Sequence, residues 1–162
     1  IGDGSSLLAA LETGQIDAYQ LSPPTPYVAQ AAGFGTVLID GPSGDVPRFA
    51  DFAYTGFAAN REWAEANPEA ARAFSSALNQ AMEQVLADPR AAAEKIVDRM
   101  SAGDLPVLQQ TLEALAPALS EDGCFDPAAV QSTLAVMHEV GITGSAGDPA
   151  EGVLWTNAYN QC

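Results

Sequence analysis

The chain has 162 residues, 48% of them hydrophobic, which is enough to bury one sizeable core. Its 6 Lys and Arg residues face 21 Asp and Glu residues, giving a formal net charge of −15 that disfavours nucleic acid and anionic lipid as general partners. No apolar run approaches the length of a membrane-spanning helix. With two cysteines and one histidine, a Cys/His metal site is not expected.

The first predicted element is a short helix that begins near residue 5. Ser5 or Ser6 can cap its exposed amides, and Gly14 can adopt the left-handed conformation that ends it. Ile16–Leu21 is then a short run suited to a β-strand. We therefore expect a helix, a glycine turn and a strand over the first 21 residues.

A proline corner follows this strand. Ser22-Pro23-Pro24 cannot continue it, because proline lacks the N–H that a β-ladder needs. Thr25 and Pro26 suit the start of a second helix, which Gly33 would end. The strand would therefore run directly into a helix N-terminus, the place where open α/β sheets bind ligands.

Two further extended segments are predicted. Thr36–Ile39 is a continuous apolar run, typical of a strand buried on both faces, and a turn-rich loop follows it. Phe49–Ala59 is rich in aromatic residues and is interrupted at Gly56, which indicates a bulge or a close approach of another chain segment.

The rest of the chain is predicted to be mainly helical. Polar residues that can cap a helix, several of them followed by proline, precede each apolar periodic stretch, at Asn60, Asn67-Pro68, Asp88-Pro89, Asp104 and Asp126-Pro127. The tail from Ile142 to Cys162 reads as a loop held by its aromatic side chains. Cys124 and Cys162 can form a disulfide in an oxidising compartment or remain two free thiols.

The order of these pieces resembles one family. It is similar to the second half of the substrate-binding proteins of ABC transporters, in the group that binds nitrate, sulfonates, taurine and pyrimidine precursors. The stretches that carry the resemblance are ALETGQIDAYQLSPPTPYVAQAAG (Ala10–Gly33), VLID (Val37–Asp40) and NPEAARAFSSALNQAMEQVLADPRAAAEKI (Asn67–Ile96).

The resemblance implies a partial α/β, type II periplasmic-binding fold. Residues 1–59 would belong to the second α/β lobe and end in a crossover strand. Residues 60–162 would form a helical region and tail that pack back on a first lobe absent from this sequence. Apolar helix faces would then remain uncovered, so we expect the chain alone to associate or to be poorly soluble.

The implied function is that of a solute-binding component of an ABC importer. Such a protein holds a small anionic or heterocyclic molecule, closes by a hinge motion and delivers it to a membrane permease, with no cofactor. The expected location is periplasmic or extracellular, with or without a lipid anchor. A ligand-sensor module is an alternative that the sequence does not separate from this one.

Helix-start and corner residues are the candidate ligand contacts, because free amides at a helix N-terminus favour anionic groups. Many relatives carry an acidic residue before the corner proline, where this chain has Ser22. Ser5, Ser6 and Thr25 can alternatively serve only as helix caps. The full candidate set is Ser5, Ser6, Ser22, Pro23, Thr25, Tyr54 and Thr55.

An enzyme is the other alternative. Pyrimidine-precursor synthesis enzymes that resemble these binding proteins rely on a histidine, a lysine and a Cys-rich segment. This chain has only His138 and Lys95, scattered in sequence, and lacks a Cys-rich motif. We therefore expect a binding protein and not an enzyme.

Overall fold

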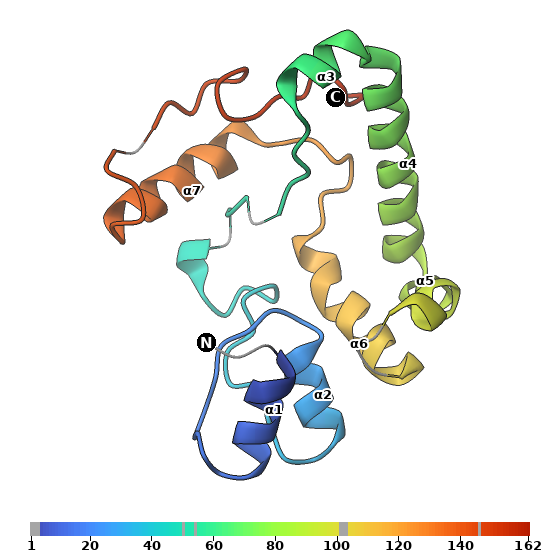
Figure 1. Ribbon diagram of the computed structural model, residues 1–162, viewed down its shortest axis with the longest axis vertical. Coiled ribbons are helices and arrows are strands. Elements are labelled where there is room, and N and C mark those ends of the chain that lie inside the picture. Colours follow the sequence, from blue (N-terminus) through green and yellow to red (C-terminus); the bar gives the residue numbers. More distant parts are fainter. Residues whose placement is uncertain (1–3, 50, 54, 101–103, 146) are drawn as a thin grey trace. The chain divides into compact units, whose positions relative to one another are not determined.

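The computed structural model describes residues 4–49, 51–53, 55–100, 104–145 and 147–162. Helices and the loops that connect them make up this part of the chain (Figure 1). The chain divides into two compact units. Unit 1 comprises Ile1–Asp45 and Gln84–Ala118, and unit 2 comprises Val46–Glu83 and Leu119–Cys162.

The predicted α/β type II periplasmic-binding fold is wrong, because no described residue belongs to a β-strand. A strand is stable only when a neighbouring strand satisfies its backbone N–H and C=O groups. Ile16–Leu21 has no such neighbour and leads from a turn into the corner at Pro23. The run Thr36–Ile39, expected to be buried on both faces, instead exposes 78% of Leu38 and 68% of Ile39.

The predicted crossover strand is also absent. Phe49 ends a 3₁₀ turn (Pro47–Phe49), residues 51–53 and 55–59 are irregular, and the backbone N–H of Ala53 donates to Thr133 Oγ1 at 2.8 Å instead of to a partner strand. The close approach predicted at Gly56 is confirmed, since a Cβ there would lie 2.8 Å from Phe125 Cζ. Apolar patterning predicted a strand here, but the segment has no partner strand among the described residues.

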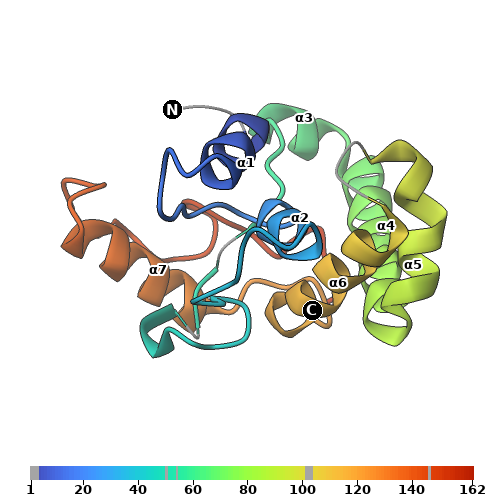
Figure 2. The same ribbon diagram turned by 90° about the horizontal axis from the view of Figure 1, so that it is seen from below.

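Unit 1 contains four α-helices among its described residues: α1 (Gly4–Glu12), α2 (Thr25–Ala31), α5 (Pro89–Ile96) and α6 (Leu105–Leu115). The 3₁₀ turns η2 (Val97–Arg99) and η3 (Ala116–Ala118) follow α5 and α6. The helices α5 and α6 pack side by side, as both views show (Figures 1 and 2), and α2 contacts both α1 and α6. This packing buries Tyr27, Ala29, Ala92, Ala93, Val107, Leu108 and Thr111.

Unit 2 is built on α3 (Arg61–Ala66), α7 (Pro127–Glu139) and most of α4 (Pro68–Ala87), preceded by the 3₁₀ turn η1 (Pro47–Phe49). Its buried apolar residues are Ala64, Ala71, Val130 and Val136. Phe57 packs edge-on against Phe74 with ring centroids 5.6 Å apart, although both rings stay largely exposed. The core of this unit is therefore small.

The helix starts predicted from residue 60 onward are confirmed. Four capping side chains accept a hydrogen bond from a first-turn N–H: Asn60 from Trp63, Asp88 from Ala91, Asp104 from Val107 and Asp126 from Ala128. The longest helix begins at Pro68, as Asn67-Pro68 indicated. The glycines expected to end helices, Gly14, Gly33 and Gly141, all have positive φ angles of 70° to 82°. None of the described helices has the length and apolar character needed to cross a membrane.

The C-terminal tail is a loop fastened to the segment before α7, as predicted. Cys124 and Cys162 form a disulfide, the pairing that the sequence left open. The side-chain amide of Asn157 exchanges hydrogen bonds with the backbone of Phe125, at 3.0 and 3.1 Å, and Asn160 donates to the Gly123 carbonyl at 2.9 Å. The Trp155 ring lies 5.8 Å from that of Phe125. Covalent, polar and aromatic contacts thus hold the tail at one place.

Asp122 organises the turn that carries Cys124. Its carboxylate accepts hydrogen bonds from the Cys124 N–H at 2.8 Å and from the Ser120 hydroxyl at 2.9 Å, and these bonds lower the pKa of Asp122. Asn79 of α4 donates to the Asp122 carbonyl at 2.8 Å. The turn is therefore positioned by α4 as well as by the disulfide.

Candidate ligand-binding site

The starts of α1 and α2 lie next to each other in unit 1. A Cβ built on Gly4 would be 3.1 Å from Thr25 Oγ1 and 3.4 Å from Leu21 Cδ2, so the two helix N-termini are in van der Waals contact. The structure therefore brings together the two helix starts to which the sequence assigned ligand contacts. Ser5, Ser6 and Ser22 are all exposed.

The predicted capping roles need correction. Helix α1 begins at Gly4, so Ser5 and Ser6 lie within its first turn and do not precede it. The cap position of α2 is Pro24, which follows a cis peptide bond after Pro23 and makes no side-chain capping hydrogen bond. Thr25 is consequently the first residue of α2 and not its cap. Because the cap residue of α2 is itself a proline, it has no side-chain oxygen with which to accept a first-turn N–H.

Tyr19 stabilises the proline corner through a hydrogen bond to the start of α2. Its hydroxyl donates to the Thr25 carbonyl oxygen at 3.2 Å, and partial burial raises the pKa of Tyr19. The hydrogen bond connects the irregular segment after α1 to the first residue of α2. A side-chain hydrogen bond therefore helps to hold the corner in place, since no described residue of the corner belongs to a β-ladder.

The other two candidates are Tyr54 and Thr55. Tyr54 is outside the described residues. Thr55 belongs to unit 2, where it is exposed in the irregular segment before α3. Whether either residue contacts a ligand stays a prediction.

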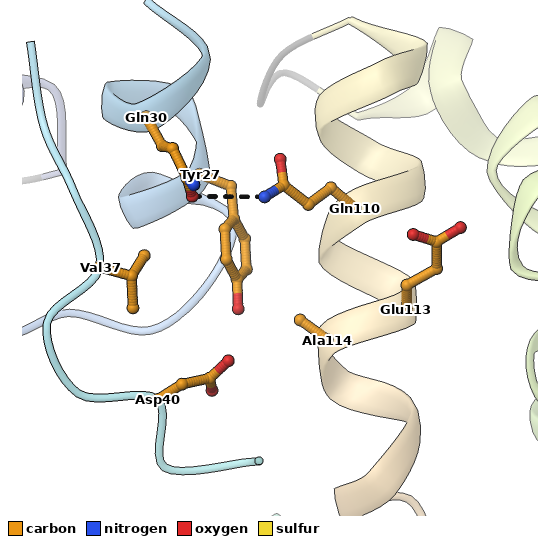
Figure 3. Close-up of a pocket in the computed structure, with 7 residues that line it drawn as sticks. All are labelled: Tyr27, Gln30, Val37, Asp40, Gln110, Glu113 and Ala114. Carbon is orange, nitrogen blue, oxygen red and sulfur yellow. Dashed lines mark hydrogen bonds between the residues drawn. The ribbon is translucent and has the colours of Figure 1, made fainter. Parts of the chain in front are cut away.

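A pocket of ≈ 500 Å³ lies on the other side of α2, between this helix, the segment after it and α6 (Figure 3). All of its lining residues belong to unit 1. It is an open hollow and not an enclosed cavity. The lining residues are Tyr27, Gln30, Val37, Asp40, Gln110, Glu113 and Ala114.

Tyr27 and Asp40 form the central polar pair of the pocket. Tyr27 is only 5% exposed, and its hydroxyl points toward the Asp40 carboxylate in Figure 3. Burial, with an added contribution from the neighbouring Asp40 carboxylate, raises the pKa of Tyr27. The tyrosine is therefore neutral at physiological pH, and the carboxylate faces a neutral donor.

Two amide side chains bridge α2 and α6 across the mouth of the pocket. Gln110 Nε2 donates to Gln30 Oε1 at 3.3 Å, a contact drawn in Figure 3. One turn further along α6, Glu113 Oε1 accepts from Gln109 Nε2 at 2.8 Å, and its carboxylate points away from Tyr27. The pocket thus offers amide donors and acceptors, one phenol and two carboxylates.

The sequence did not single out these pocket residues. Asp40 was assigned to a turn and Tyr27 to the second helix, and neither was given a role. The pocket also needs residues of α6, such as Gln110, which contacts Gln30 from 80 positions away in sequence, so no local pattern could indicate it. The available hint was that an aspartate directly ends the apolar run Val37–Ile39.

The groups that an enzyme of the resembling type would need do not line the pocket. Lys95 Nζ donates to Gln84 Oε1 at 2.6 Å on an exposed face of unit 1. His138 is exposed near the end of α7 in unit 2, with Nδ1 3.4 Å from the Thr143 carbonyl oxygen. Within the described residues, no group of three or more His, Cys, Asp or Glu side chains could hold a metal ion.

Comparison with known proteins gives one match. Residues 2–92, more than half of the chain, match the family model described as NMT1/THI5 like. The matched range includes the corner and the pocket residues of α2 and the following segment, but not those of α6. No curated protein and no solved structure matches the chain significantly.

Proposed function

The chain belongs to the NMT1/THI5-like family, and on this premise we propose that it is the solute-binding component of an ABC importer. The family includes both ABC substrate-binding proteins and enzymes of pyrimidine-precursor synthesis. In the proposed role the chain takes up a small molecule in the unit 1 pocket and passes it to a permease in the membrane.

The pocket is the observation that supports this role. Its volume of ≈ 500 Å³ lies within the range typical of small-molecule sites. Its lining is mostly polar, with Val37 and Ala114 as the aliphatic side chains, and Tyr27, Gln30 and Gln110 can fix the orientation of a solute. Such a lining suits reversible binding.

Binding is favoured over turnover by the positions of the candidate catalytic groups. Neither Lys95 nor His138 lines the pocket, and both cysteines are joined in a disulfide. A disulfide also suits an oxidising compartment. We therefore place the proposed activity outside the cytoplasm.

The proposal is tested by a ligand screen on the full chain. Thermal unfolding is followed with nitrate, taurine, an alkanesulfonate, aromatic carboxylates, aminopyrimidines and amidines, and isothermal titration confirms each hit. A ligand at 100 times its Kd should stabilise the folded chain by about 2.7 kcal/mol. Gln110→Ala should weaken binding about three- to tenfold, because one polar contact to the solute is lost.

A matched control is Gln131→Ala, which removes an exposed glutamine from α7 in unit 2 and should leave the Kd unchanged. Absence of binding across the screen would contradict a solute-binding role. Conversion of a pyrimidine precursor to a product would instead favour the synthesis enzyme.

A further inference from the structure

The unit 1 pocket carries negative charge, whereas the predicted contacts at the helix N-termini favour anionic ligands. Asp40 and Glu113 bring two carboxylates to its lining, and no lysine, arginine or histidine lines it. The first 45 residues contain no Lys, Arg or His. The whole chain carries a formal charge of −15. A bound anion would therefore find no cationic side chain in the pocket and would meet a negative field.

Asp40 is held in place by its own loop. Its backbone N–H donates to Asp45 Oδ2 at 2.8 Å, and its carbonyl oxygen accepts from the Ser43 hydroxyl at 2.9 Å and from the Asp45 N–H at 3.3 Å. These bonds fix the main chain at Asp40 through the turn over residues 41–44. The carboxylate is thus presented to the pocket without needing the ligand to order the loop.

The Asp40 carboxylate retains capacity for further donors. An ionised carboxylate can accept about four hydrogen bonds, and the Tyr27 hydroxyl is the pocket-lining donor that points toward it in Figure 3. Charge-assisted N–H bonds to a carboxylate are about twice as strong as neutral ones. A cationic N–H group is the ligand chemistry that best complements this remaining capacity.

We propose that the pocket takes a solute bearing a protonated amine or amidine, whose N–H groups bond to the Asp40 carboxylate while Gln30 and Gln110 contact its uncharged part. This assignment rests on the proposed solute-binding function. Glu113 acts at the rim, where its carboxylate contributes charge but points away from Tyr27. Anionic solutes such as sulfonates or carboxylates are excluded by the same groups.

Three probes of one shape and different charge test the assignment on the full chain. Benzamidinium, benzamide and benzoate are cationic, neutral and anionic, and each is titrated at millimolar concentrations by NMR and calorimetry. Benzamidinium should bind at least tenfold more tightly than benzoate, with benzamide between them. Its affinity should fall as salt is raised from 20 to 300 mM, because screening weakens the attraction.

Three variants test which carboxylate binds the cationic group. Asp40→Asn should weaken benzamidinium binding about tenfold, since a charge-assisted bond becomes neutral. Glu113→Gln should weaken it only about twofold, because this carboxylate acts from the rim. Asp98→Asn, an exposed change in η2 of the same unit, is the matched control and should leave the affinity unchanged.

Each outcome has a distinct meaning. Equal or tighter binding of benzoate, or loss of benzamidinium affinity through Asp98→Asn as large as through Asp40→Asn, overturns the cation assignment. Failure of benzamidinium to bind while another screened solute binds overturns it too and leaves the solute-binding role intact. If no solute binds, both the cation assignment and the solute-binding role are overturned. Circular dichroism and the unfolding midpoint of Asp40→Asn show that any loss of binding occurs in a folded chain.

Discussion

Tyr27 is the residue that connects stability and ligand recognition in unit 1. It is almost fully buried, and its hydroxyl points toward the Asp40 carboxylate. Burial of a phenol beside a carboxylate is energetically acceptable only while the phenol keeps its proton, because the phenolate would be desolvated and repelled by the carboxylate. The pair therefore makes the stability of unit 1 sensitive to alkaline pH.

The first prediction concerns this pH dependence. The folded-state pKa of Tyr27 is raised above the unfolded value near 10, so its contribution to stability is fully present below about pH 10 and is lost as pH rises through the folded pKa. Urea unfolding midpoints measured from neutral to strongly alkaline pH should show this loss. Tyr27→Phe should be less stable at neutral pH and should lose less on the alkaline side.

The control for this prediction is Tyr159→Phe in the tail, which should keep the wild-type alkaline profile. Tyr19, whose pKa burial also raises, remains in both variants, so some alkaline loss persists. An alkaline profile of Tyr27→Phe that overlays the wild-type profile would contradict the Tyr27–Asp40 account.

Asp104 carries the second prediction. Its carboxylate caps α6 by accepting the Val107 N–H at 3.2 Å, and Val107 is in the buried seam of unit 1. Asp104→Ala should lower the free energy of unfolding by about 1 kcal/mol, as measured by denaturant titration. Asp98→Ala, nearby and exposed, should change it by less than about 0.5 kcal/mol. Equal effects of the two changes would count against the cap.

At the scale of single residues, the sequence predicted helix caps well and the pocket poorly, for one physical reason. A cap joins a side chain to an amide two or three positions away, so the local sequence at Asp88, Asp104 and Asp126 is enough to predict where each helix begins. Asp40 and Gln110 meet only after the chain has folded, and 70 positions separate them. Residue types within a short window carry no information about such a meeting.

At the scale of elements, Gly35 sets how closely the segment after α2 can pack. A Cβ at this position would lie 2.7 Å from the Cβ of Ala29, which is 2% exposed and cannot move aside. The third prediction is that Gly35→Ala lowers the free energy of unfolding by about 1–3 kcal/mol through overpacking. Denaturant titration measures this change.

The matched control is Gly41→Ala in the following turn, where a Cβ would meet nothing within 4 Å and the backbone is not in the left-handed region. This change should be nearly neutral or slightly stabilising, because alanine restricts the unfolded chain more than glycine does. A destabilisation equal to that of Gly35→Ala would show that packing against Ala29 is not the cause.

Helices and strands were predicted with unequal success because they differ in what they require. A helix satisfies its backbone within its own sequence, so α4, α5, α6 and α7 appear where caps and apolar stripes indicated. A strand needs a partner, and the apolar run at Leu38 and Ile39 has none among the described residues. Resemblance to an α/β family supplied the expectation of a sheet, while the family itself was identified correctly.

At the scale of the whole molecule, the core is thin relative to the apolar content. Several of the buried apolar residues are alanines, and no large side chain is fully buried among the described residues. Bulky apolar side chains are instead exposed in both units, including Leu38, Ile39, Phe57, Phe74, Ile142 and Leu154. Such surfaces favour association, which the net charge of −15 opposes.

The fourth prediction follows from this balance. Charge repulsion is screened within about 8 Å at physiological salt but reaches about 30 Å at 0.01 M, so the chain should associate as salt is raised. Light scattering coupled to size exclusion should show a mass that increases with NaCl. Replacing Leu38 and Ile39 by serine should reduce the increase, and Thr36→Ser should not. A single monomeric mass at every salt concentration would contradict it.

The fastening of the tail has a topological consequence. The disulfide closes the chain from Cys124 to Cys162 into a ring, and no lysine or arginine occurs anywhere after Arg99. Trypsin therefore cannot open the ring, and both cysteines stay on one peptide that starts at Met100. A cut by a glutamate-specific protease at Glu139 or Glu151 would open the ring without releasing either piece until a reductant is added. The covalent continuity of unit 2 beyond Gly123 thus does not depend on every peptide bond within the ring.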